Sequence, residues 1–156
     1  MVITYGKEIG VADEIARVWF TLPLPPSVNS QYARVGNRRV LSKEAKSFKK
    51  AVVGRIHRLR VDGVITDAFV QALQTSWIGI FMDMYFESPL RRDLDGGLKI
   101  TQDAVLETLG VNDNRVVDIH LVKRIDPLKP RVEIELEAIP EWQFDKTYIT
   151  LDPNSD

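Results

Sequence analysis

Hydrophobic and polar residues alternate with different periods along the chain, and the period predicts which segments form strands. Residues 17–24 carry an apolar side chain at every second position and run into a cluster of prolines, which predicts a strand. Residues 77–87 alternate with apolar residues on both faces, which is typical of a strand in the centre of a sheet. Residues 116–124 and 131–138 alternate again around an Asp-Pro turn, so we expect them to pair as a hairpin.

Two other segments show the spacing of an amphipathic helix. Over residues 43–60 apolar residues recur at intervals of three and four, the opposite face is almost entirely basic, and Ser42 can cap the first turn. Residues 94–109 show a second apolar stripe, and Gly110 is placed to end that helix. These elements predict an α+β fold: a mixed, mostly antiparallel β-sheet with two main α-helices.

The remaining segments are predicted as connections and extensions of one domain. Residues 27–40 form a loop, and residues 61–76 form a connector with a helical turn or two. We expect a core over about residues 18–138, with an N-terminal extension over 1–15 and an acidic tail over 140–156. Three aromatic residues of the tail are expected to dock on the body or on a partner subunit: Trp142, Phe144 and Tyr148.

Composition narrows the class of protein. A chain of 156 residues is long enough for one well-buried core and short for two domains. No apolar run approaches the roughly 20 residues of a membrane span, so no membrane association is expected. The absence of cysteine and of a secretory start favours a reducing cytoplasm. With only two histidines, His57 and His120, carboxylates must carry any metal chemistry.

The near-neutral total charge conceals a strongly basic segment. The chain has a net charge of −1, but residues 34–60 contain ten Lys or Arg residues and a single acid, a local net charge of +9. Such a segment is the electrostatic footprint expected where a protein contacts nucleic-acid phosphates. A solvated helix face is an equally good interpretation of the charge alone.

The most informative stretch lies where the central strand passes into the second helix. Asp93 and Asp95 can turn two carboxylates toward one hard cation such as Mg²⁺, and Lys99 lies one turn further along the same helix face. There Lys99 can neutralise charge on a phosphate while the metal polarises it. A third acid, Asp113, follows the helix and reaches this site only through the returning strand, or from a neighbouring subunit.

Each of these residues also has a purely structural interpretation. Asp93 is a good N-cap, and Asp95 with Lys99 can be an ordinary i, i+4 ion pair. Asp113 belongs to a common turn pair with the following asparagine. Asp118 and His120 on the next strand are either groups that support metal ligands or solvated side chains.

Several of these motifs occur together in an order that resembles the RusA family of Holliday junction resolvases. The matching segments are residues 22–29 (LPLPPSVN), 91–95 (RRDLD) with Lys99, and 111–118 (VNDNRVVD). The resemblance implies a homodimeric, Mg²⁺-dependent endonuclease, with Mn²⁺ as an alternative ion, that nicks opposed strands of four-way junction DNA. Such enzymes are often encoded by phages or prophages and act in DNA recombination and repair.

Carried over by position, the resemblance makes Asp93, Asp95 and Asp113 the metal-binding acids and Lys99 the catalytic lysine. The family commonly has Asn after the second aspartate, whereas Gly96-Gly97 stands here, which predicts a looser turn. The candidates for contacting DNA are the bases of the loop, the helix and the motif: Arg34, Arg38, Arg39, Lys43, Lys46, Lys49, Lys50, Arg91 and Arg92.

Two other functions remain open from the sequence. A non-catalytic protein that binds junction or duplex DNA would keep the basic face and have a degraded metal site. A metal-dependent nucleotide-handling enzyme would use the two aspartates, but no glycine-rich phosphate loop accompanies them. Tyr32, in the predicted loop, can stack on a base or simply pack.

Overall fold

The computed structural model describes residues 16–147. The predicted N-terminal extension, Tyr148 and the last residues of the tail lie outside this range. Its strands and α-helices, in chain order, are β1 (Ala16–Pro23), β2 (Tyr32–Val35), β3 (Arg38–Leu41), α1 (Lys43–Val61), α2 (Asp67–Thr75), β4 (Trp77–Phe86), α3 (Leu98–Leu109), β5 (Val116–Ile125) and β6 (Arg131–Ile139). Short 3₁₀ turns cover Val28–Ser30, Leu94–Gly97 and Asp113–Arg115.

Four of the strands form one mixed sheet in the order β1-β6-β4-β5. The pairs β1–β6 and β6–β4 are antiparallel, and β4–β5 is parallel. The predicted α+β class with a mostly antiparallel sheet and the central position of β4 are therefore confirmed. The number of helices is three rather than two within the described residues, because the connector after α1 contains α2.

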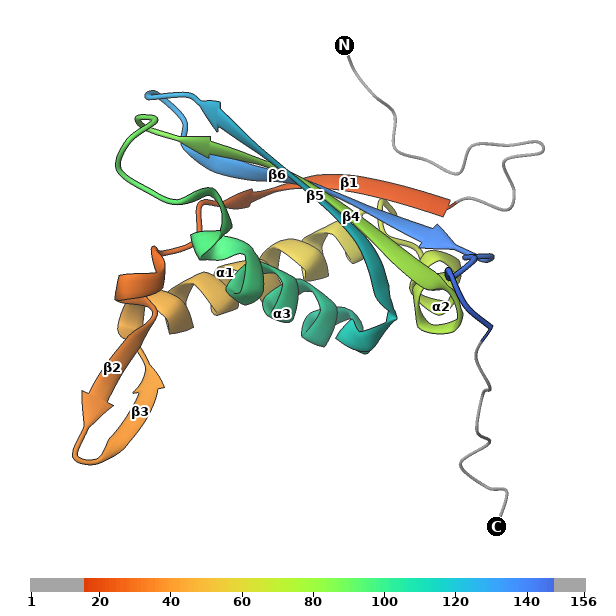
Figure 1. The fold of residues 1–156 in the computed structure, drawn as a ribbon, viewed down its shortest axis with the longest axis horizontal. Helices are drawn as coiled ribbons and strands as arrows, with labels where there is room; N and C mark the ends of the chain where they lie inside the picture. Colours follow the sequence, from red (N-terminus) through yellow and green to blue (C-terminus); the bar gives the residue numbers. More distant parts are fainter. Residues whose placement is uncertain (1–15, 148–156) are drawn as a thin grey trace.

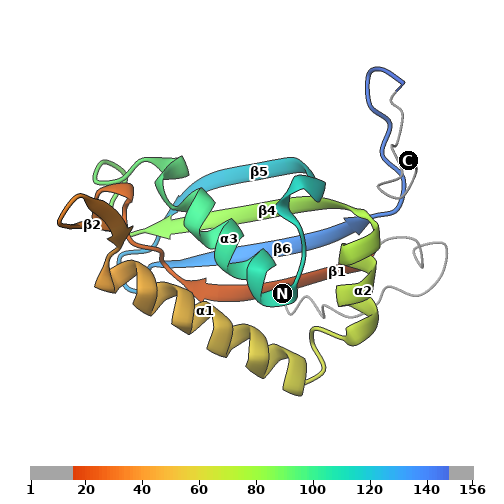
Figure 2. The ribbon, with the colours of Figure 1, turned by 90° about the horizontal axis from the view of Figure 1, so that it is seen from below.

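The predicted hairpin of β5 and β6 is wrong. β6 lies between β1 and β4, and β5 lies on the far side of β4 at the sheet edge (Figure 2). The connection through α3 brings β5 back parallel to β4, as a strand–helix–strand unit does. β6, whose alternate residues are buried, then occupies the inner position, whereas most of β5 stays exposed at the edge.

The helices pack on one side of the sheet, and their apolar faces meet the buried face of the strands (Figure 1). On α1 the residues predicted from the spacing are the buried ones: Ala45, Phe48, Val52, Ile56 and Leu59. The Ser42 hydroxyl caps α1 by accepting a hydrogen bond from the Ala45 amide. α3 ends at Gly110, whose φ of 67° is a left-handed conformation that glycine adopts without strain.

The predicted loop over residues 27–40 is largely a β-hairpin. β2 and β3 pair with each other around Gly36 and project from the body of the molecule, beside the start of α1 (Figure 1). All four residues of β2 are exposed, so no hydrophobic alternation marks the strand in the sequence. The basic segment therefore begins on a projecting hairpin and continues along α1.

The second face of the sheet carries no helix in the part of the chain that the structure describes (Figure 1). Its side chains pair with one another, as in the stacked rings of Phe81 and His120 and the ion pair of Asp83 with Arg124. At one end Phe144 packs edge-on against Trp77, with ring centroids 5.3 Å apart, so this part of the tail docks on the body. None of the described helices is long and apolar enough to cross a membrane.

Candidate active site

Asp93 and Asp95 lie on the 3₁₀ turn Leu94–Gly97, between the loop after β4 and the start of α3. Asp93 occupies the N-cap position with an extended backbone, but its side chain makes no capping hydrogen bond. Both carboxylates are exposed, and neither has a hydrogen bond or ion pair to another residue of the described range. Capping therefore does not account for these two acids, and both remain available to a ligand.

Two glycines allow the turn to pack tightly against the chain before the hairpin. A Cβ atom on Gly97 would lie 2.4 Å from Cγ of the Pro25 ring, so no larger residue fits there without displacing the ring. The Gly96 carbonyl accepts a hydrogen bond of 2.7 Å from the side-chain amide of the buried Gln31, which also donates to the Pro26 carbonyl. The Gly96-Gly97 pair, from which the sequence predicts a looser turn, is thus held by two contacts: Gly97 packs against Pro25, and Gly96 accepts a hydrogen bond from Gln31.

The loop that leads into Asp93 is fixed by two cations. The Lys123 ammonium of β5 donates hydrogen bonds to the carbonyls of Pro89 and Arg92, at 3.0 and 2.8 Å. The Arg92 guanidinium donates to the Pro25 carbonyl at 2.7 Å, and burial lowers its pKa from the ordinary value. Arg92 and Lys123 both lie over the ring of Phe86. This clamp sets the position of the residue directly before Asp93.

Lys99 is oriented by an acid of its own helix. Its ammonium pairs with the Asp103 carboxylate at 3.1 Å, one turn further along α3, so the ion pair with Asp95 that the spacing allowed does not form. The pKa of Lys99 is raised above its ordinary value, first by the hydrogen bond to Asp103, then by the negative charge of Asp103 and, more weakly, of Asp113. Lys99 therefore carries a full positive charge at neutral pH.

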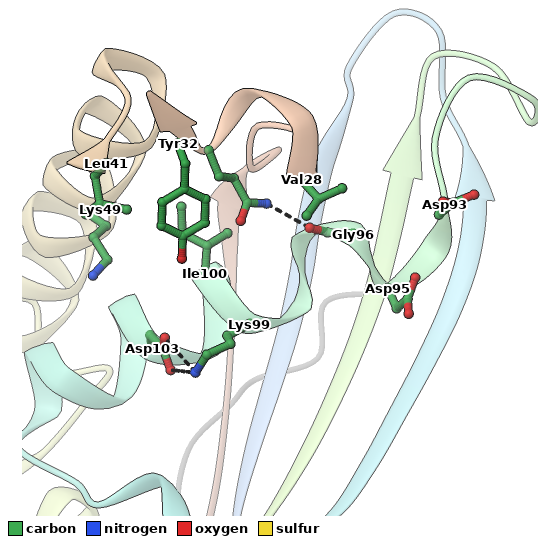
Figure 3. Close-up of a pocket in the computed structure, with 11 residues that line it drawn as sticks. Val28, Tyr32, Leu41, Lys49, Asp93, Asp95, Gly96, Lys99, Ile100 and Asp103 are labelled. Atoms are coloured by element: carbon green, nitrogen blue, oxygen red, sulfur yellow. Dashed lines mark hydrogen bonds and ion pairs between the residues drawn. The ribbon is translucent and has the colours of Figure 1, made fainter. Parts of the chain in front are cut away.

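These groups line one pocket of about 340 Å³ between the turn, α3, α1 and the base of the hairpin. Figure 3 shows Asp93 and Asp95 at one end, Lys99 with Asp103 below, and Tyr32 with Lys49 at the other end. The pocket thus joins two unpaired carboxylates to an ammonium and to the start of the basic segment.

Asp113 lies on its own 3₁₀ turn at the start of β5 and is exposed. The Asn112 side chain caps this turn by accepting from the Asn114 amide, so Asp113 is not needed for the cap. Within residues 16–147 no group of three His, Cys, Asp or Glu side chains has the geometry to hold a metal ion. The structure therefore brings Asp93 and Asp95 to one pocket and leaves Asp113 outside a three-acid cluster.

The donor set of the pocket nevertheless fits Mg²⁺. Magnesium prefers oxygen ligands and is usually held by one or two carboxylates, with water and substrate phosphate oxygens completing its shell. Asp93 and Asp95 supply two such carboxylates, and neither forms an ion pair with a cation of the described residues.

The basic residues expected to contact DNA differ in exposure and in whether their side chains already have a partner within the protein. The three arginines of the hairpin are exposed, as are Arg91 and three lysines of α1: Lys43, Lys46 and Lys50. Lys49 is half-buried, faces the pocket and pairs with Glu107 at 3.5 Å. Arg92 is committed to the clamp described above. The exposed cations form a surface from the hairpin along α1.

The histidines lie away from the pocket. His120 pairs with Asp118 at 3.0 Å on the open face of the sheet, and His57 is exposed on α1. Neither histidine is among the residues that line the pocket.

An acidic pocket with an adjacent ammonium and a basic surface beside it is the arrangement of an enzyme that acts on a nucleic-acid backbone. A model of the family described as Endodeoxyribonuclease RusA matches residues 23–137. The chain therefore belongs to the endodeoxyribonuclease RusA family and is an endonuclease. Both the family resemblance and the enzyme class predicted from the sequence motifs are confirmed.

Two further similarities were found. The chain is 27% identical over 124 residues to the crossover junction endodeoxyribonuclease rusA of Enterobacteria phage HK97, covering 77% of this chain and 96% of the relative. A solved structure, 2C-methyl-D-erythritol 2,4-cyclodiphosphate synthase from Plasmodium vivax, covers 83% of this chain and 99% of its own at 11% identity and a TM-score of 0.31. We draw no conclusion from this second likeness.

Several residues that build the site were not predicted from the sequence. Asp103 stands four residues after Lys99, so the same helical spacing that suggested Asp95 also pointed to it. Gln31 and Lys123 act through backbone carbonyls that are 65 and 31 residues away in sequence, and no local pattern marks such contacts.

Proposed function

We propose that this protein is a Mg²⁺-dependent endonuclease that resolves four-way DNA junctions by paired nicks in opposed strands. The observation that carries the proposal is the pocket in which the unpaired carboxylates of Asp93 and Asp95 lie with Lys99, next to the exposed cations of the hairpin and α1. The phage relative, whose name is that of a crossover junction endonuclease, supports the substrate and a phage or prophage origin.

In this mechanism Asp93 and Asp95 would hold the metal, with Asp113 of the same or a partner subunit as the third ligand. Bound there, Mg²⁺ would supply Lewis-acid polarisation of the scissile phosphate and activate water at neutral pH. The Lys99 ammonium, kept protonated by Asp103, stabilises the negative charge that develops on the phosphate oxygens. Glu107 and Asp103 keep Lys49 and Lys99 in place across the pocket.

The exposed cations bind the DNA backbone. The three hairpin arginines and the exposed lysines of α1 contact phosphates beyond the hairpin end of the pocket, and Arg91, which lies near Asp93, contacts the backbone at the acidic end. Contacts of this kind carry no sequence information, so recognition of the junction rests mainly on its shape and deformability.

We further propose that the active species is a homodimer in the cytoplasm. A four-way junction has near two-fold symmetry, and a two-fold dimer presents two equivalent sites to opposed strands.

The test is a nicking assay on a labelled four-way junction with and without Mg²⁺. We expect paired nicks by the wild type with Mg²⁺ and a loss of at least about 100-fold for Asp95→Asn, the size of effect that follows removal of a group that stabilises the transition state. Asp62→Asn, which changes an exposed acid at the far end of α1, serves as the matched control and should nick normally. Junction binding without Mg²⁺-dependent nicks would refute the catalytic proposal and select a binding protein.

A further inference from the structure

The hairpin places an exposed aromatic ring at the wall of the active-site pocket. Tyr32 pairs with Leu41 in the hairpin register, and Arg34 pairs with Arg39, so these four side chains share one face of the hairpin. Tyr32 lines the pocket together with Leu41, and the residue is 42% exposed.

The pocket has two chemically different ends. One end holds Asp93 and Asp95. The end toward the hairpin is lined by Tyr32, Leu41 and Ile100, which is buried on α3, with the half-buried Lys49 beside them (Figure 3). A phosphate at the acidic end, held through a metal, would leave its attached nucleoside directed toward a wall of aromatic and aliphatic groups. Metal chemistry alone does not require such a wall.

Arg39 orients the Tyr32 ring. The Arg39 guanidinium carbon lies 4.0 Å from the ring centroid, a cation–π contact that fixes the ring and covers one of its faces. Tyr32 offers the rest of its ring to the pocket, while Arg39 and Arg34 continue outward along the same hairpin face. From the two acids outward, the groups are therefore an aromatic ring and then the arginines of the same hairpin face.

We propose that the hairpin end of the pocket is a nucleobase site, in which Tyr32 stacks on an unstacked base next to the scissile phosphate. The inference deepens the proposed function and rests on it. Stacking on an aromatic ring tolerates any base, because every base has a π-face. The cost of extruding the base is lowest where the duplex is already interrupted, as at a branch point. The site would thus favour junctions over continuous duplex.

A double-mutant cycle between protein and DNA tests this contact. Tyr32→Leu removes the ring. An abasic nucleotide, placed first on one side of the scissile phosphate and then on the other, removes the base. We expect each change alone to weaken Mg²⁺-free junction binding about 10-fold, the size that follows loss of one stacked base. Combined, they should weaken it no further, because both remove the same contact. Tyr32→Phe keeps the ring, so the abasic nucleotide should weaken its junction binding about 10-fold, as it does for the wild type.

The matched control is Tyr85→Leu. Tyr85 also lies under an arginine, Arg131, at 3.9 Å, but it alternates with the buried residues of β4 and faces the open side of the sheet. Its loss should leave the effect of the abasic nucleotide unchanged.

The outcomes separate the two proposals. If the wild type nicks junctions but the effects of Tyr32→Leu and of the abasic nucleotide simply add at both positions, the base site is refuted and the proposed function stands. If the wild type neither binds nor nicks junctions, the proposed function fails and the base site fails with it.

Discussion

The two adjacent glycines after Asp95 provide a sharp test of how the active-site turn is packed. Gly97→Ala places a methyl group where the structure has 2.4 Å to Cγ of Pro25, whereas the nearest atom to a Cβ on Gly96 is 3.9 Å away. Neither glycine has a positive φ, so alanine strains neither backbone. The same substitution at neighbouring positions therefore differs mainly in steric contact.

The expected free energies follow from that difference. Inserting a methyl group into a closely packed site costs about 1–3 kcal/mol, because the neighbouring groups must move. Replacing a glycine whose backbone suits alanine stabilises by about 0.4–1 kcal/mol through the unfolded state. For a chain of 156 residues each kcal/mol shifts Tm by about 2–4 °C. We expect Gly97→Ala to melt below the wild type and Gly96→Ala at or slightly above it.

Urea unfolding, followed by the fluorescence of the three tryptophans, measures the free energy of unfolding of both variants. An unchanged m-value would show that the folded and unfolded states remain comparable. Wild-type stability of Gly97→Ala, or an equal loss in Gly96→Ala, would show that the turn does not pack against Pro25 as described.

Three further predictions concern the clamp, the lysine and the open face of the sheet. Lys123→Met removes the two hydrogen bonds to the loop before Asp93. It should slow nicking by up to about 100-fold, the effect of misplacing a reacting group by about 1 Å, and leave Mg²⁺-free DNA binding unchanged. An unchanged nicking rate would refute the role of the clamp. Asp103→Asn removes the main group that raises the pKa of Lys99, so the loss of nicking at high pH should begin at a lower pH than in the wild type; identical alkaline limbs in the pH–rate profile would contradict this. Burial raises the pKa of Glu135, so folding favours the protonated carboxyl and the folded state loses stability as pH rises through the folded pKa. Glu135→Gln should therefore raise Tm at pH 7, and the gain should shrink on acidification. An equal or lower Tm of this variant at pH 7 would disprove the prediction.

The sequence predicts the elements of this fold better than their arrangement. The spacing of Phe48, Val52 and Ile56 identifies the buried face of α1, because a helix that packs on a sheet must turn one stripe inward. The predicted pairing of β6 with β5 is wrong because alternation specifies which face of a strand is buried and not which strand lies beside it. The sequence does not predict the hairpin of β2 and β3, because every side chain of β2 is exposed and the partly buried residues of β3 are adjacent rather than alternating.

For the site, the sequence indicates the chemistry but not the supports. Asp93, Asp95 and Lys99 stand close together in the chain, so their shared pocket follows from one turn of backbone. The position of Asp113 depends on how β5 returns, which no local pattern determines. The contacts of Lys123 and Gln31 join distant segments through backbone carbonyls and become visible only in the folded chain.

The most direct test of the central claim is to locate a divalent ion in a crystal of the protein bound to a four-way junction. With Mn²⁺ in place of Mg²⁺, the anomalous signal reports the ion itself. The account predicts a peak within ligand distance of the carboxylates of Asp93 and Asp95, with Asp113 of the same or the partner subunit beside it, and no peak in Asp95→Asn. A peak elsewhere, or a bound junction with Asp113 remote from the other two acids in every subunit, would contradict it.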